Sequence, residues 1–143
     1  MFLVDANVLV YAADSSSIHH EPSAAWLDAA LNGSKQVGLP WQCIGSFLRL
    51  VTNPRVMETP MSPNDAWAQI QRWLDVPTTW IPPTGARTAT LLGEVLGNSQ
   101  VAGNLTSDAQ LAAIALEHGL TVVTLDSDFG RFPVPVLDPR RTP

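Results

Sequence analysis

The chain has 143 residues, 45% of them hydrophobic and 15% charged, with a formal net charge of −5 at pH 7. This length favours a single domain with a buried core, and no apolar run approaches the ~18 to 20 residues that cross a bilayer, so we expect a cytoplasmic protein without a membrane segment. The acidic balance argues against a broad basic surface for nucleic acid, and the single cysteine, Cys43, excludes an intramolecular disulfide and a cysteine-rich zinc site.

Short apolar strands alternate with helices in the first half of the chain. The run Phe2-Leu3-Val4 is apolar throughout, which is typical of a parallel strand covered on both faces, and Asp5 would stand at its carboxyl end. Helical spacing of apolar residues and stop signals such as Asn32-Gly33 define the later segments. In chain order we predict a strand at residues 2–4, helices at 7–13 and 20–31, a strand at 37–39 and a helix at 41–52.

The predicted helix at residues 41–52 has two distinct faces. A wide apolar stripe indicates that most of the helix is buried, while a narrow polar line follows another face. The stripe consists of Trp41, Ile44, Phe47, Leu48 and Val51, and the polar line consists of Gln42, Ser46, Arg49 and Asn53.

The second half of the chain continues the alternation. Ser62 and Pro63 form a helix start, and the apolar face that follows is Ala66, Trp67, Ile70, Trp73 and Leu74. We further predict a strand at 78–81, a helix from its cap Thr84 to Leu96 closed by Gly97-Asn98, a helix at 108–118 capped by Thr106 or Ser107, a strand at 121–125 and an edge strand at 134–137. The helix at 108–118 is apolar almost all round, so we expect it to be buried with Asp108 at its head.

This alternation predicts an α/β fold, with one domain over residues 1–143 built on a short parallel sheet that has helices on both faces. In open parallel sheets, ligands bind beyond the carboxyl ends of the strands, where the strand order switches. Asp5 follows the first strand and Asp126 follows the fourth. A flavodoxin-like order would place these two strands near each other at the centre of the sheet.

Four aspartates that follow or open apolar segments are expected to converge at that edge: Asp5, Asp108, Asp126 and Asp128. Carboxylates held together in a partly desolvated cleft repel each other, so we expect Mg²⁺ or Mn²⁺ bound by Asp5, Asp108 and Asp126. Such an ion polarises a phosphoryl oxygen, which predicts hydrolysis of a phosphodiester with Asp128 completing the catalytic set. Each acid could instead only cap a helix, and Asp128 could face solvent.

Three ordered motifs resemble those of PIN domains, and in particular of VapC-type toxins. They are Val4-Asp5-Ala6-Asn7, Ser107-Asp108-Ala109-Gln110-Leu111-Ala112-Ala113 and Val123-Thr124-Leu125-Asp126-Ser127-Asp128-Phe129, and Phe47 to Pro54 is similar to a further segment of that family. The resemblance covers nearly the whole chain and implies a PIN-like nuclease domain. It implies a Mg²⁺-dependent endoribonuclease toxin of a type II toxin–antitoxin system, which cuts structured RNA such as tRNA, is inhibited by a cognate antitoxin protein and forms a homodimer.

One position departs from the family's pattern. Many PIN domains carry an acid directly before the segment that begins at Phe47, where this chain has Ser46. A serine hydroxyl adds no charge, so the number of metal ions is open unless Glu94 or Glu117 replaces the acid. The alternative function is therefore a PIN-fold protein with weak or lost nuclease activity that acts by binding a partner or RNA.

Two further side chains are candidates for supporting the site. Asn7 could hydrogen-bond a site carboxylate or only cap a helix, and Arg49 could pair with a site carboxylate or contact a phosphate. The five tryptophans at helical spacing favour the core or a subunit interface over base stacking. Two rival enzyme or binding classes fit less well, because a receiver-like domain needs a lysine later than Lys35 and a haloacid-dehalogenase-like phosphatase needs an aspartate in place of Asn7.

Overall fold

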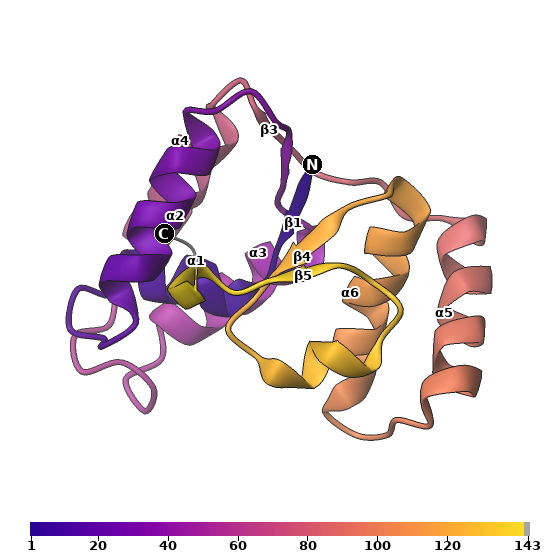
Figure 1. Ribbon diagram of the computed structural model, residues 1–143. Coiled ribbons are helices and arrows are strands. Elements are labelled where there is room, and N and C mark those ends of the chain that lie inside the picture. The colour runs from indigo at the N-terminus through magenta and orange to yellow at the C-terminus, as the bar shows by residue number, and fades with distance from the viewer. Residues whose placement is uncertain (142–143) are drawn as a thin grey trace.

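Five short parallel strands form the sheet at the centre of the molecule, and helices cover both of its faces (Figure 1). The computed structural model describes residues 1–141, so residues 142 and 143 of the predicted domain lie outside the described part. This arrangement confirms the predicted α/β fold class. The elements are β1 (Phe2–Val4), α1 (Ala6–Ala13), α2 (His20–Leu31), β2 (Val37–Gly38), α3 (Trp41–Val51), α4 (Pro63–Leu74), β3 (Thr79–Trp80), α5 (Ala86–Ser99), α6 (Leu105–His118), β4 (Thr121–Val123), the 3₁₀ helix η1 (Ser127–Arg131), β5 (Val136–Leu137) and the 3₁₀ helix η2 (Pro139–Arg141).

The strand order is β3-β2-β1-β4-β5, which differs from the flavodoxin-like order that we considered. β1 lies in the middle and pairs directly with β4, with Val4 opposite Val123. The chain steps outward from β1 to β2 and β3 and then returns to the other side of β1. The order therefore switches between β1 and β4, and the segments that leave these two strands begin as direct neighbours.

Side chains alternate between the two faces of the central strands, so each face has its own core. Val4 and Val123 contribute to the core that lies under α1, α2 and α4. Leu3 and Val122 contribute to the core under α5 and α6. Figure 1 shows these two helical layers on opposite sides of the sheet. The prediction that the last long helix is buried is confirmed, since residues 111–115 of α6 are at most 3% exposed.

The boundaries of α5 and α6 differ from those predicted. α6 begins at Leu105, so Thr106, Ser107 and Asp108 all lie inside its first turn and neither of the two predicted residues is the cap. α5 continues through the predicted stop to Ser99 and ends where Gln100 adopts a left-handed backbone conformation. Leu96 packs against the core beside α6, and this tertiary contact holds the last turn of α5 despite its poor helix formers.

Two tryptophans that we assigned to apolar faces are exposed instead. Trp41 is 67% exposed and Trp67 is 43% exposed. Trp41 is the first residue of α3 and extends past the buried stripe, while the buried face of α4 consists of Ala66, Ile70 and Trp73. Among residues 1–141, no helix is both long enough and apolar enough to cross a membrane.

Candidate active site

Asp5 is held at the junction between the two central strands. Its backbone N–H donates to the carbonyl of Val123, and its side chain caps α1 by accepting from the N–H of Ala6 at 2.7 Å. The other carboxylate oxygen accepts from Thr124 Oγ1 at 2.8 Å. Burial raises the pKa of Asp5, and the charge of Asp126 acts in the same direction, whereas the hydrogen bonds from Thr124 and Ala6 oppose the rise. The predicted cap and the predicted site residue are thus the same group.

Asn7 and Thr124 connect Asp5 to the segment that follows β4. The Asn7 amide donates to Thr124 Oγ1 at 3.1 Å and more weakly to Asp5 at 3.4 Å, and its oxygen accepts from the N–H of Leu125. Thr124 Oγ1 also accepts from the N–H of Asp126 at 3.1 Å. Asn7 therefore does hydrogen-bond a site carboxylate, as we considered, and this network fixes Asp5 and Asp126 relative to each other.

Thr124 was missed in the sequence analysis, although it is 1% exposed and sits at the centre of this network. The available signal was a hydroxyl at the end of a β-branched apolar run, directly before Leu125 and Asp126. A buried hydroxyl needs hydrogen-bond partners, and the expected partners of this one were the polar groups at the ends of the neighbouring strands.

Asp126 and Asp128 bracket the start of η1. Asp126 caps this short helix by accepting from the N–H of Asp128 at 2.8 Å. Asp128 forms an ion pair with Arg131 at 3.2 Å, and its side chain is about half exposed. Asp126 therefore faces the network around Asp5, while part of the charge of Asp128 is already offset.

Asp108 faces the other acids from α6. Partial burial raises its pKa to about 6, and the charges of Asp5, Asp126 and Asp128 contribute to this rise, while the positive charge of Arg131 opposes it. The structure therefore brings all four predicted aspartates within electrostatic reach of one another. The positive charge of Arg131 offsets only part of the repulsion among these carboxylates.

This group of acids suits a hydrated hard cation better than a closed metal site. Among residues 1–141, no three His, Cys, Asp or Glu side chains stand close enough to hold one ion together, so Asp5, Asp108 and Asp126 are not preassembled as three direct ligands. Mg²⁺ commonly uses only one or two carboxylates and keeps several waters. The excess negative charge and the oxygen-only donors fit such an ion.

α3 passes beside this group without adding an acid. Cys43 is buried, and burial together with the charges of Asp5 and Asp108 raises the pKa of its thiol, which places the start of α3 next to the site. Ser46, one turn later, is half-buried. Arg49 makes no ion pair within residues 1–141, so of the two roles considered for it the structure does not show the pairing with a site carboxylate.

Neither glutamate that could have replaced the missing acid does so. Glu117 accepts a hydrogen bond from Thr88 and lies beside His118, nine residues from Asp108 and so roughly 13 Å along α6. Glu94 is exposed on α5. Among the residues considered, the four aspartates are therefore the acids that the structure brings to the candidate site.

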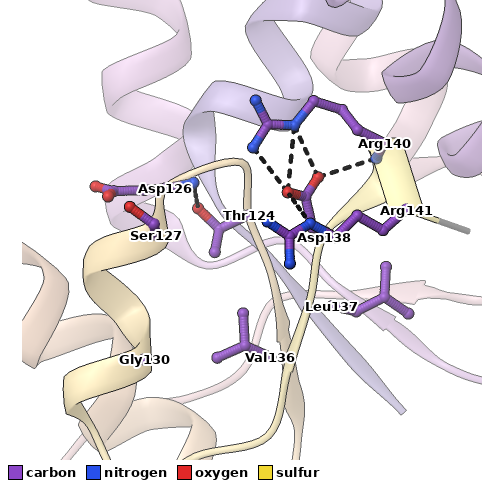
Figure 2. A pocket seen from close by; sticks show the side chains of 9 residues that line it. All are labelled: Thr124, Asp126, Ser127, Gly130, Val136, Leu137, Asp138, Arg140 and Arg141. Carbon is purple, nitrogen blue, oxygen red and sulfur yellow. Dashed lines mark hydrogen bonds and ion pairs between the residues drawn. The ribbon is translucent and has the colours of Figure 1, made fainter.

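A hollow of about 450 Å³ opens beside Asp126 (Figure 2). Its polar wall continues from Asp126 and Ser127 to Asp138, Arg140 and Arg141 of the last turn. No role was predicted for Asp138, Arg140 or Arg141 from the sequence. The complete lining is Thr124, Asp126, Ser127, Gly130, Val136, Leu137, Asp138, Arg140 and Arg141.

Comparisons with a family model, with related sequences and with solved structures all identify similar proteins. A family model described as PIN domain matches residues 2–135. The chain is 42% identical to ribonuclease VapC37 of Mycobacterium tuberculosis over 132 residues, which cover 92% of each protein. Among solved structures it is similar to FitAcB from Neisseria gonorrhoeae, with a TM-score of 0.74 and 22% identity over 99% of this chain and 100% of that one. A chain of a toxin-antitoxin complex from Klebsiella pneumoniae is similar with a TM-score of 0.65 and 18% identity, over 97% of this chain and 98% of that one.

Proposed function

Given that this chain belongs to the PIN-domain family and is a VapC-type ribonuclease toxin of a toxin–antitoxin system, we propose that it is an endoribonuclease that hydrolyses phosphodiester bonds of structured RNA, such as tRNA, with Mg²⁺ or Mn²⁺. The ion would be held by Asp5, Asp108 and Asp126, in part through water. When bound, it would offset the carboxylate charge, polarise the scissile phosphate and activate the attacking water.

The observation that supports this most directly is the pKa of Asp108, which burial and three neighbouring carboxylates raise to about 6. Ionised carboxylates held this close repel each other, and a bound cation would lower the free energy of the folded protein by reducing that repulsion. Groups with strongly displaced pKa values are also candidates for function. In this proposal the repulsion among the acids is the driving force for metal binding.

The chain's own residues would divide the work between holding and orienting. Thr124 and Asn7 fix the carboxylate of Asp5 by direct hydrogen bonds, so that it needs no rearrangement when the ion arrives. Asp128 would act as the outer acid of the set. Its side chain pairs with Arg131 and is about half exposed, so substrate and water can reach it. Ser46 would support the site through its hydroxyl, and Arg49 would contact an RNA phosphate from α3.

We further propose an antitoxin protein as the natural inhibitor and a homodimer as the working form. The similarity to a chain of a toxin-antitoxin complex supports the first part. Exposed apolar side chains such as Trp41 and Trp67 offer contact area for a protein partner. A basic segment of the antitoxin with an arginine would suit the excess acid charge of the site.

The decisive experiment is incubation of the purified protein with total bacterial tRNA, in Mg²⁺ or in chelator, with the cut ends analysed by sequencing. We expect cleavage only with the metal and new ends that carry a 5′-phosphate. Asp108→Asn should abolish cleavage, while Asp28→Asn, an exposed aspartate on α2, should not change it. Cleavage that survives both chelation and Asp108→Asn would refute the proposed mechanism.

A second candidate function follows from Ser46, because α3 supplies no acid to the site. The chain would then be a PIN-fold protein with weak or lost nuclease activity that acts by binding RNA or its partner. Retention of tRNA without any cleavage over a wide range of Mg²⁺ and Mn²⁺ concentrations would favour this function over the first.

A further inference from the structure

The hollow beside Asp126 has two walls of opposite charge. Asp126 and Ser127, at the start of η1, form the acidic wall, and Arg140 and Arg141 of η2 form the basic one (Figure 2). Val136 and Leu137 of β5 line it between the two walls. Its volume of about 450 Å³ falls within the ~300 to 1,000 Å³ typical of ligand sites.

Arg140 is fixed in this wall by several hydrogen bonds. Its Nε donates to both carboxylate oxygens of Asp138, at 3.0 and 3.2 Å, and its Nη2 donates to Asp138 at 2.7 Å and to the carbonyl of Leu125 at 3.0 Å. Within residues 1–141, Nη1 has no hydrogen-bond partner, and Figure 2 shows it on the side of the guanidinium away from Asp138. The bond to Leu125 ties the arginine to the same loop that carries Asp126.

Arg141 adds a second positive charge at this wall. Its Nε lies 3.8 Å from Asp138, which is already bound by Arg140, and its side chain is 85% exposed. The two arginines therefore share one carboxylate, and this wall keeps an excess of one positive charge. A guanidinium held by hydrogen bonds beside an exposed one is an arrangement that can contact a phosphate at more than one oxygen.

The negative net charge of the protein makes the arginines of this basic wall important for binding RNA. At a net charge of −5, the protein has no broad field to attract a polyanion, so RNA must be held by a few placed cations. Arg131, on η1, is committed to Asp128. Arg140 and Arg141 are the cations that line the hollow next to the acids.

We propose that this hollow binds a backbone phosphate of the RNA substrate next to the phosphate that is cut, with Arg140 and Arg141 as its ligands and with Val136 and Leu137 against the adjoining sugar or base. This inference rests on the proposed ribonuclease function and adds to it a second contact that sets the register of the strand. Asp138 is then a positioning residue, because it acts through Arg140.

The test measures binding separately from cleavage. In an Asp108→Asn background, which prevents cutting, fluorescently labelled total tRNA is titrated by anisotropy in chelator at several salt concentrations. We expect Arg141→Ala to weaken binding severalfold and the Arg140→Ala, Arg141→Ala pair to weaken it roughly tenfold. The slope of log affinity against log salt should fall by about 0.7 to 0.9 for each phosphate that the protein no longer neutralises. Arg87→Ala, an exposed arginine on the distant helix α5, is the matched control and should change neither quantity beyond its small effect on net charge.

Arg140→Lys guards against a folding artefact, since it keeps the charge but removes the forked geometry. We expect it to bind more weakly than the parent while its melting temperature stays close to that of the parent. If the wild type cleaves tRNA but both Arg141→Ala and the double variant bind with the affinity and salt slope of Arg87→Ala, the phosphate site is wrong and the ribonuclease function stands. If the wild type neither binds nor cleaves tRNA, the ribonuclease function fails and this site fails with it.

Discussion

Asp108, which belongs to the group of Asp5, Asp126 and Asp128 (the Asp108 side), and Asp138, which belongs with Arg140 and Arg141 (the Asp138 side), differ in what surrounds them. Burial and three other carboxylates raise the pKa of Asp108, whereas hydrogen bonds from Arg140 lower the pKa of Asp138. The carboxylate of Asp138 is satisfied by the protein itself. That of Asp108 faces charge of its own sign, and this difference supports the proposal that a cation binds beside Asp108, whereas Asp138 already has its partner in Arg140.

The largest expected effect is the loss of stabilisation by Mg²⁺ when Asp5, the central acid on the Asp108 side, is removed. Saturating Mg²⁺, at about 100 times its dissociation constant, should stabilise the wild type by about 2.7 kcal/mol, which raises the melting temperature by roughly 5 to 10 °C. Asp5→Ala should abolish this gain, because it removes the carboxylate at the junction of β1 and β4. Thermal scans with Mg²⁺ or chelator measure it, and Asp28→Ala on α2 is the control that should keep the full shift.

A somewhat smaller effect on stability is expected from removing the hydroxyl of Thr124, which hydrogen-bonds Asp5 and Asp126. Thr124→Val keeps the shape of the side chain but leaves the carboxylate of Asp5 and the N–H of Asp126 without their partner. We expect a loss of about 1 to 3 kcal/mol in the free energy of unfolding. Urea denaturation measures this loss, and an unchanged midpoint would show that the network contributes nothing to stability.

Removing the charge of Asp108 should stabilise the protein in the absence of metal. Its pKa in the folded state is raised from 3.8 to about 6, so the folded state binds more protons than the unfolded state between these values and stability falls as the pH rises through them. Because the group is partly exposed, we expect Asp108→Asn to gain about 1 kcal/mol at pH 7. Denaturation in chelator at pH 4 and pH 7 should show the gain only at pH 7, and an equal gain at both would contradict the electrostatic cause.

The smallest expected effect has the opposite sign and lies on the Asp138 side. The lowered pKa of Asp138 means that its ionised form stabilises the fold, so this contribution is present above pH 3.8 and is lost as the pH falls through the folded-state pKa. Asp138→Asn should cost about 0.5 kcal/mol at pH 7, as is typical of surface pairs. A gain in stability at pH 7, measured by urea denaturation, would remove the contrast with Asp108.

The sequence allowed the convergence of Asp5 and Asp126 to be predicted, because both follow apolar runs and parallel strands end at one edge of a sheet. It did not allow the strand order to be predicted, since strands of two or three residues carry too little pattern to specify their neighbours. The roles of Thr124 and Arg140 also could not be predicted. Each depends on contacts with Asp5 or Leu125 that exist only after the sheet has formed.

The direct pairing of β1 with β4 has a consequence for the toxin during its own synthesis. Asp5 and Thr124, which share a hydrogen bond, are 119 residues apart, so the ribosome must release most of the chain before they can meet. A growing or truncated chain that ends before β4 carries Asp5 and Asp108 but lacks Thr124, Asp126 and Asp128. We therefore expect the proposed site to assemble only after β4 and η1 have left the ribosome, late in the synthesis of the chain.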